Sequence, residues 1–174
     1  MQIIYPIIFF LLSLKWAKWK NFLLYYPTVL FMIVGNLLYS FLFKDYPLWR
    51  FEHTFEKNVL PTRMSIDLLK TFTSFPILTI IYLSNLPEKE TFKKYGIYIL
   101  SWSILFGSIE YVSKQLGMIT YHHGWNMGWS LIFDSCMFSL LAVHYKRPII
   151  AWIISIIFIL FLWNTFDIHF ELLK

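Results

Sequence analysis

The sequence predicts an all-α integral membrane protein, a bundle of five or six transmembrane helices with one interfacial amphipathic segment. Three observations predict this class: 58% of the 174 residues are apolar, only 14% are charged, and the mean hydropathy is positive. Soluble domains average about 25% charged residues. The chain lies outside that range, and we expect residues 1–174 to form a single transmembrane domain.

Charge and cysteine content exclude several classes of function. The net charge is +5, but the basic residues lie between apolar blocks and not on a shared face, which is typical of topology signals. Nucleic acid is therefore not an expected partner. The single cysteine, Cys136, excludes an intrachain disulfide and a thiolate zinc site. No metal and no cofactor are predicted.

A first apolar block covers residues 3–14, or residues 3–19 if Trp16 and Trp19 lie at the membrane interface. At about 1.5 Å per residue the shorter version is roughly 18 Å long, less than the hydrocarbon core of about 30 Å. Basic residues follow this apolar run, whereas in a secretory signal they precede it. We expect a retained first helix, and whether it spans the membrane stays open.

The second and third blocks are long enough to span. Residues 21–43 carry Pro27 in their first turns, where a missing N–H is best tolerated. Residues 63–86 lie between two prolines, and Pro76 in their middle removes one backbone hydrogen bond, which predicts a kink.

Between these blocks, residues 44–62 mix charges with aromatic side chains. Leu48, Phe51, Phe55 and Val59 recur at three- and four-residue steps, a spacing that would give a helix one apolar stripe. We expect an amphipathic helix in the membrane interface. An ordered loop rich in aromatic residues is the alternative.

Three further spans complete the bundle, at residues 95–114, 125–144 and 149–166. The last begins at Pro148, which suits the first turn of a helix. It is apolar on all sides from Ile149 to Leu162, which favours a lipid-facing position.

Basic residues in the loops predict the orientation. With six spans, the loops at 15–20, 85–94 and 145–148 share one side and carry eight cations, against six on the other side. Four of those six lie in residues 44–63, together with three acids. Because short cytoplasmic loops carry the excess of Lys and Arg, both termini are expected outside, in a bacterial cytoplasmic membrane.

The same topology brings polar side chains from five helices into one half of the bilayer. Charged groups in the hydrocarbon region are costly and usually face protein or a cavity, so the grouping predicts a one-sided pocket. Asp134 lies deepest, near the midplane. The expected pocket residues are Asn36, Asp67, Lys70, Glu110, Lys114, His122, His123, Asn126, Ser130, Asp134 and Asn164.

The helix at 125–144 is expected at the centre of the bundle. Asn126, Ser130 and Asp134 recur every four residues and form a polar stripe. A central Asp costs about 2.5–3.5 kcal/mol on insertion scales, so Asp134 requires partners inside the protein. Roughly opposite lies a stripe of small residues that would let another helix approach closely: Gly124, Gly128, Ser135 and Ser139.

We expect the pocket to bind a lipid or prenyl-type amphiphile by its headgroup. One alternative is an intramembrane enzyme acting on a lipid, with Glu110 and Asp134 as acid and base and His123 as a further catalytic candidate. A structural or accessory subunit and a small transporter also stay open, although one-sided polar groups fit a pocket better than a transport path. Membrane lipid is the expected partner, and a protein partner or homo-oligomer stays open.

Neighbouring residues in this region have other interpretations. Glu110 and Lys114, four residues apart, could form an intrahelical ion pair or bind a zwitterionic headgroup. His122 and His123 are adjacent, so their side chains point in different directions and do not predict a shared metal ion. Trp125 is expected in the interfacial aromatic belt.

Three runs of the sequence resemble an uncharacterised family of small multi-pass membrane proteins from spore-forming Firmicutes. They are PTVLFMIVGNLLYSFLFKDYPLW (27–49), YHHGWNMGWSLIFD (121–134) and HYKRPIIAWIISIIFILFLWNTFDI (144–168). The resemblance covers nearly the whole chain. It implies a multi-pass membrane protein of a spore-forming bacterium, but no substrate. The family commonly has Asp where this chain has Asn36 and Trp where it has Gly128, which weighs against an essential carboxylate at position 36 and against the small-residue spacing.

Overall fold

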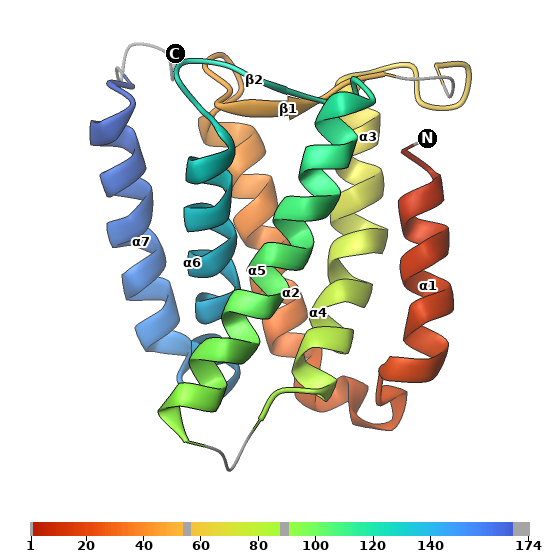
Figure 1. Ribbon diagram of the computed structural model, residues 1–174, viewed down its shortest axis with the longest axis vertical. Helices are drawn as coiled ribbons and strands as arrows, with labels where there is room; N and C mark the ends of the chain where they lie inside the picture. The colour runs from red at the N-terminus through yellow and green to blue at the C-terminus, as the bar shows by residue number, and fades with distance from the viewer. Residues whose placement is uncertain (1, 54–56, 88–90, 169–174) are drawn as a thin grey trace.

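The computed structural model describes residues 2–53, 57–87 and 91–168 and forms a bundle of helices that run roughly side by side (Figure 1). The all-α membrane fold class is confirmed, because five helical stretches are long and apolar enough to cross a membrane. The helices are α1 (Ile4–Trp16), α2 (Phe22–Leu42), α3 (Arg63–Leu69), α4 (Phe75–Ser84), α5 (Phe92–Gln115), α6 (Met127–Lys146) and α7 (Pro148–Thr165), with two short segments, η1 (Trp19–Asn21) and η2 (Lys70–Ser74).

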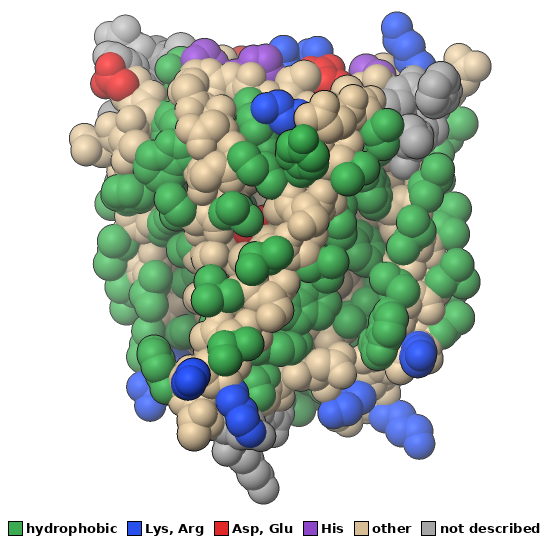
Figure 2. Space-filling view, in the orientation of Figure 1, with side chains coloured by type: hydrophobic (Ala, Val, Ile, Leu, Met, Phe, Trp, Pro, Cys, Tyr) green, Lys and Arg blue, Asp and Glu red, His purple; other side chains and the backbone are tan. Residues whose placement is uncertain are grey.

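The five apolar stretches lie where the sequence places its five longer spans. They are Trp19–Leu42, Arg63–Ser84, Phe92–Gln115, Met127–Lys146 and Pro148–Thr165. Helix α1 has only 13 residues and packs against α4 and η2. Apolar side chains cover the middle of the molecule and charged side chains gather at its two ends, as a bilayer requires (Figure 2).

The third span changes its hydrogen bonding directly before Pro76. Segment η2 is a π-helix, and at its end the N–H of Phe75 bonds to the carbonyl of Lys70, five residues back. In a regular α-helix the proline ring would clash with the carbonyl four residues earlier, and a wider π turn relieves that clash. The kink predicted from Pro76 stays a prediction, and three side chains of the π turn, Lys70, Thr71 and Ser74, are buried.

Helix α6 lies at the centre of the bundle and packs against α2, α4, α5 and α7. Its contact with α5 is tight at Gly107, where an added Cβ would lie 2.5 Å from Cδ2 of Leu131. The expected approach along Gly124 and Gly128 is wrong. Gly124 precedes the helix with φ of 82°, and a Cβ on Gly128 would meet only Asn126, the residue that caps the same helix.

An interfacial helix at 44–62 is also wrong for the described part of that segment. Residues 44–53 and 57–62 contain no helix, and strand β1 (Trp49–Phe51) pairs antiparallel with β2 (Ile119–Tyr121). Phe55, which the helical pattern needs, lies outside the described residues. Short β-branched and aromatic runs suit a strand when a partner satisfies their backbone groups, and here the partner comes from a distant loop.

The paired strands lie across one end of the bundle (Figure 1). We call residues 48–52 with 118–122 the β cap, and this end the cap end. The Tyr39 hydroxyl of α2 donates to the Trp49 carbonyl at 2.9 Å and accepts from the Trp49 N–H at 3.1 Å. Nε2 of Gln2, next to α1, donates to the carbonyls of Glu52 and Met118, each at 3.0 Å. The cap is thereby fastened to the first two helices.

Glu52 makes the ionic contacts of the cap. Its carboxylate accepts hydrogen bonds from Arg50 at 3.1 Å, from Arg63 at 3.0 and 3.1 Å, and from Thr120 at 3.0 Å. Burial works to raise the pKa of this carboxyl, but the hydrogen bonds from Arg63 and Thr120, with the charges of Arg63 and Arg50, hold it below the ordinary 4.5.

Gly107→Leu should destabilise the bundle by about 1–3 kcal/mol, the usual cost of overpacking a tight contact. Gly107→Ala should cost less, because Leu131 is 36% exposed and can turn away from a single methyl group. Thermal unfolding in detergent measures both. The matched control is Gly96→Leu on the same helix, where an added Cβ meets nothing within 4 Å. Equal melting temperatures for Gly107→Leu and Gly96→Leu would contradict the close α5–α6 contact.

Acid should weaken the β cap through Glu52. A carboxyl whose pKa is lowered by folding stabilises the protein above pH 4.5, its ordinary pKa, and this contribution is lost as the pH falls through the folded-state pKa. Melting temperature measured against pH should therefore fall more steeply below that value in the native protein than in Glu52→Gln. Parallel curves for the two proteins would show that this carboxylate does not stabilise the cap.

Candidate functional site

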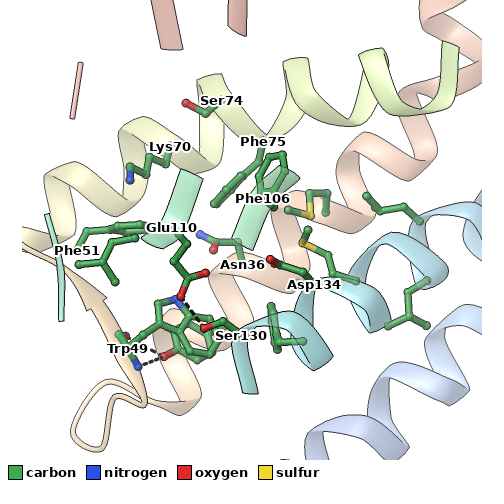
Figure 3. A pocket seen from close by; sticks show the side chains of 18 of the residues that line it. Asn36, Trp49, Phe51, Lys70, Ser74, Phe75, Phe106, Glu110, Ser130 and Asp134 are labelled. Carbon is green, nitrogen blue, oxygen red and sulfur yellow. Dashed lines mark hydrogen bonds between the residues drawn. The ribbon is translucent and has the colours of Figure 1, made fainter. Parts of the chain in front are cut away.

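A cavity of about 250 Å³ lies inside the bundle below the β cap. Side chains from α1, α2, η2, α4, α5, α6, α7 and both strands line it, and most of them are aromatic or aliphatic. Phe75 and Phe106 form part of this apolar wall (Figure 3). Such a lining suits hydrocarbon better than a polar solute.

Five of the expected pocket residues line the cavity, from four different elements (Figure 3). They are Asn36 of α2, Lys70 of η2, Glu110 of α5, and Ser130 and Asp134 of α6. Helices α2 and α5 end at the cap end, whereas α3 and α6 begin there (Figure 1). That alternation gathers polar positions distant in sequence at one end of one cavity.

Glu110 is held by two hydroxyl groups. One of its oxygens, Oε1, accepts hydrogen bonds from Tyr121 of β2 and from Ser130, each at 2.5 Å. Ser130 in turn accepts from the indole N–H of Trp125 at 2.8 Å. Burial raises the pKa of Tyr121, and its bond to Glu110 raises it further, so the phenol keeps the proton that it donates.

The expected ion pair between Glu110 and Lys114 does not form, although the structure describes both side chains. Nζ of Lys114 lies instead 4.3 Å from the centre of the Tyr121 ring. A cation over an aromatic face is stabilised by about 0.5–1 kcal/mol at exposed sites. Lys114 is exposed and lies outside the cavity lining.

Asp134 faces the cavity one helical turn beyond Ser130. It is 7% exposed, and its Oδ2 has no hydrogen-bond partner among the described residues. A buried polar atom left unpaired costs about 1–3 kcal/mol. Oγ of Ser74, another lining residue, is buried and unpaired in the same way. The cavity therefore presents unused hydrogen-bonding groups to whatever fills it.

Lys70 is the cation of the cavity. It is 6% exposed, and its Nζ lies 3.3 Å from the centre of the Phe51 ring and 5.4 Å from that of Tyr5. No carboxylate of a described residue forms an ion pair with it. Aromatic faces attract its charge without neutralising it, so Lys70 can still pair with an anionic or hydrogen-bond-accepting group.

Asn36 joins α2 to the π turn. Its side-chain amide donates to Oγ1 of Thr71 at 2.6 Å, and that hydroxyl donates to the carbonyl of Asp67 at 2.6 Å. The amide nitrogen is thereby engaged with the protein. The amide of Asn36 is sufficient for this hydrogen bond between α2 and η2, so position 36 does not require a carboxylate.

Six expected pocket residues lie outside the cavity lining. His123 is exposed and has φ of 52°, and its ring stacks on that of Tyr46 with 3.5 Å between the ring centres. His122 contacts Thr120 at 3.0 Å, and its pKa is lowered by partial burial and by the charge of Arg50. The full set is Asp67, Lys114, His122, His123, Asn126 and Asn164.

Local structure explains several of these positions. Asn126 is the N-cap of α6 and accepts from the N–H groups of Gly128 at 2.9 Å and Trp129 at 3.3 Å. Asn164 is exposed in the last turn of α7. Among the described residues, no three acidic, His or Cys side chains come together as metal ligands would.

Aromatic residues that complete the site could not be recognised from spacing. Trp125 is 5% exposed and bonds to Ser130, so its expected place in an interfacial belt is wrong. Tyr121 reaches Glu110 from the β cap, which no helical periodicity predicts. Phe51 reaches Lys70 from the same cap.

No family model matches the chain, and no curated protein or solved structure shows similarity to it. The resemblance to a family from spore-forming Firmicutes stays a prediction. The cavity itself offers the carboxyl groups of Glu110 and Asp134, the amino group of Lys70, the amide of Asn36 and several hydroxyl groups, all in an otherwise apolar lining.

Proposed function

We propose that this protein binds a lipid or prenyl-type amphiphile inside the cavity, with the polar headgroup near Asp134 and Lys70. The observation that carries the proposal is the unpaired Oδ2 of Asp134, buried where it lines an apolar space. A headgroup hydroxyl or amine can donate to this oxygen. Hydrocarbon can fill the space between the aromatic and aliphatic walls.

Selectivity in such a site depends on the polar end. A hydrocarbon chain that moves from the bilayer into an apolar cavity gains little, because lipid tails are as apolar as the side chains it meets. Hydrogen bonds and charge pairs made in a medium of low dielectric constant contribute more. Lys70 offers donors and a positive charge, and Asp134 and Glu110 offer acceptors.

The distribution of basic residues between the two ends of the molecule supports an orientation in the membrane. The end opposite the cap carries basic side chains in the described loops and helix ends (Figure 2). Cytoplasmic loops are enriched in Lys and Arg, so we place the β cap and both termini outside a cell membrane and the cavity nearer the outer leaflet. The described basic residues of the cytoplasmic end are then Lys15, Lys18, Lys20, Lys93, Lys94, Lys146 and Arg147.

A lipid-modifying enzyme is the second candidate, favoured by the presence of Glu110 and Asp134 in one cavity. Glu110 is engaged by two hydroxyls, so Asp134 is the carboxylate free to exchange a proton with a ligand. His123 has no part in this version, because it lies outside the cavity. A structural or accessory subunit would need these groups only for folding.

Asp134→Leu tests the proposal against a purely structural role. Leucine has a similar volume and removes the unpaired oxygen, so the melting temperature should stay equal or rise. The amount of lipid that remains with protein purified in mild detergent, measured by solvent extraction and mass spectrometry, should fall. Asp67→Leu is the matched control, because Asp67 lies at the same end but does not line the cavity. A folded Asp134→Leu protein that keeps its lipid would contradict the proposal.

A further inference from the structure

Helices α2 and α7 both line the cavity. Near the end opposite the cap, the ring of Phe31 meets Trp152 edge to face at 4.8 Å. Near the cap, Phe43 and Leu162 belong to one buried cluster. The main packing partner of α7 is α6.

Between these two levels the cavity lining includes Gly35 of α2 and Ser155 and Ile159 of α7. Gly35 is exposed although it lines the cavity, and an added Cβ there would find no atom within 4 Å. An exposed lining residue with open space beside it marks a place where the cavity reaches the molecular surface. The two helices thus leave a lateral opening, with Gly35 on one edge.

The depth of this opening decides what can pass through it. Gly35 is seven residues before the end of α2 at Leu42, which is about 10 Å along a helix axis. The hydrocarbon core is about 30 Å thick, so the opening faces lipid tails and not water. Exposed Ile153, Ile156 and Ile157 on α7 are consistent with hydrocarbon around it.

We propose that the ligand is an amphiphile with one slender acyl or isoprenoid chain, and that this chain passes between α2 and α7 at Gly35 while the headgroup stays near Asp134 and Lys70. This inference rests on the proposed function and adds the class of ligand and its route. The small Gly35 lets a chain lie against the helix backbone. The aliphatic Ile159 forms the facing edge.

Gly35→Trp tests the route, because an added Cβ at Gly35 meets no atom within 4 Å and the indole beyond it would fill the opening. Gly96→Trp on α5 is the matched control, since Gly96 also has no atom within 4 Å of an added Cβ and does not line the cavity. The probe is a long-chain fatty alcohol with a diazirine close to its hydroxyl group, added to each protein in phosphatidylcholine vesicles. Cross-linked peptides are mapped by mass spectrometry after illumination.

In the native protein and in Gly96→Trp, we expect cross-links on the inward-facing Phe133 and Met137 and around Ser155. In Gly35→Trp the inward cross-links should be lost, with melting temperature and elution volume unchanged. Inward cross-links that survive in Gly35→Trp would overturn the route and leave the proposed function standing.

Native protein cross-linked only on outward positions such as Ile153 and Ile157 would instead contradict binding in the cavity itself. Loss of the inward cross-links in Gly96→Trp as well would assign the effect to the bulk of tryptophan and overturn the route.

Discussion

The hydrogen bonds that converge on Glu110 determine how the cap end is built. This carboxylate belongs to α5 and accepts from Tyr121 of β2 and Ser130 of α6, so it joins a strand to two helices at one point. Groups buried in a membrane protein have no bulk water to bond, and each must find its partner inside the fold. With Glu110 and Ser130 engaged, Asp134 one turn deeper is left with an unpaired oxygen facing the cavity.

Backbone irregularity contributes on the opposite wall. The π turn before Pro76 leaves Lys70 and Ser74 buried, and both line the cavity. π-helical turns in α-helices often coincide with functional sites. Here the turn brings a cation and an unpaired hydroxyl to the same space as Asp134, while the ring of Phe51 in the β cap covers the charge of Lys70. The β cap and the π turn thus both contribute side chains to one site.

The fold class and the five long spans could be predicted because long apolar runs, prolines and loop charges are local signals. Convergence of polar residues followed from alternating helix direction, and the structure brings Asn36, Lys70, Glu110, Ser130 and Asp134 to one cavity. The β cap could not be predicted, since a three-residue strand is specified by a partner some seventy residues away and not by its own periodicity. His122 lies in the cap, His123 follows it and stacks on Tyr46, and Asn126 is the N-cap of α6, and helical spacing alone predicts none of these positions.

The most direct measurement is an experimental density map of the protein purified from membranes without added ligand. The account predicts elongated density inside the cavity, with its polar end within hydrogen-bonding distance of Oδ2 of Asp134 and its tail directed toward the gap between α2 and α7. Discrete peaks of water alone, or a single ion bound by Asp134 and Glu110, would contradict it.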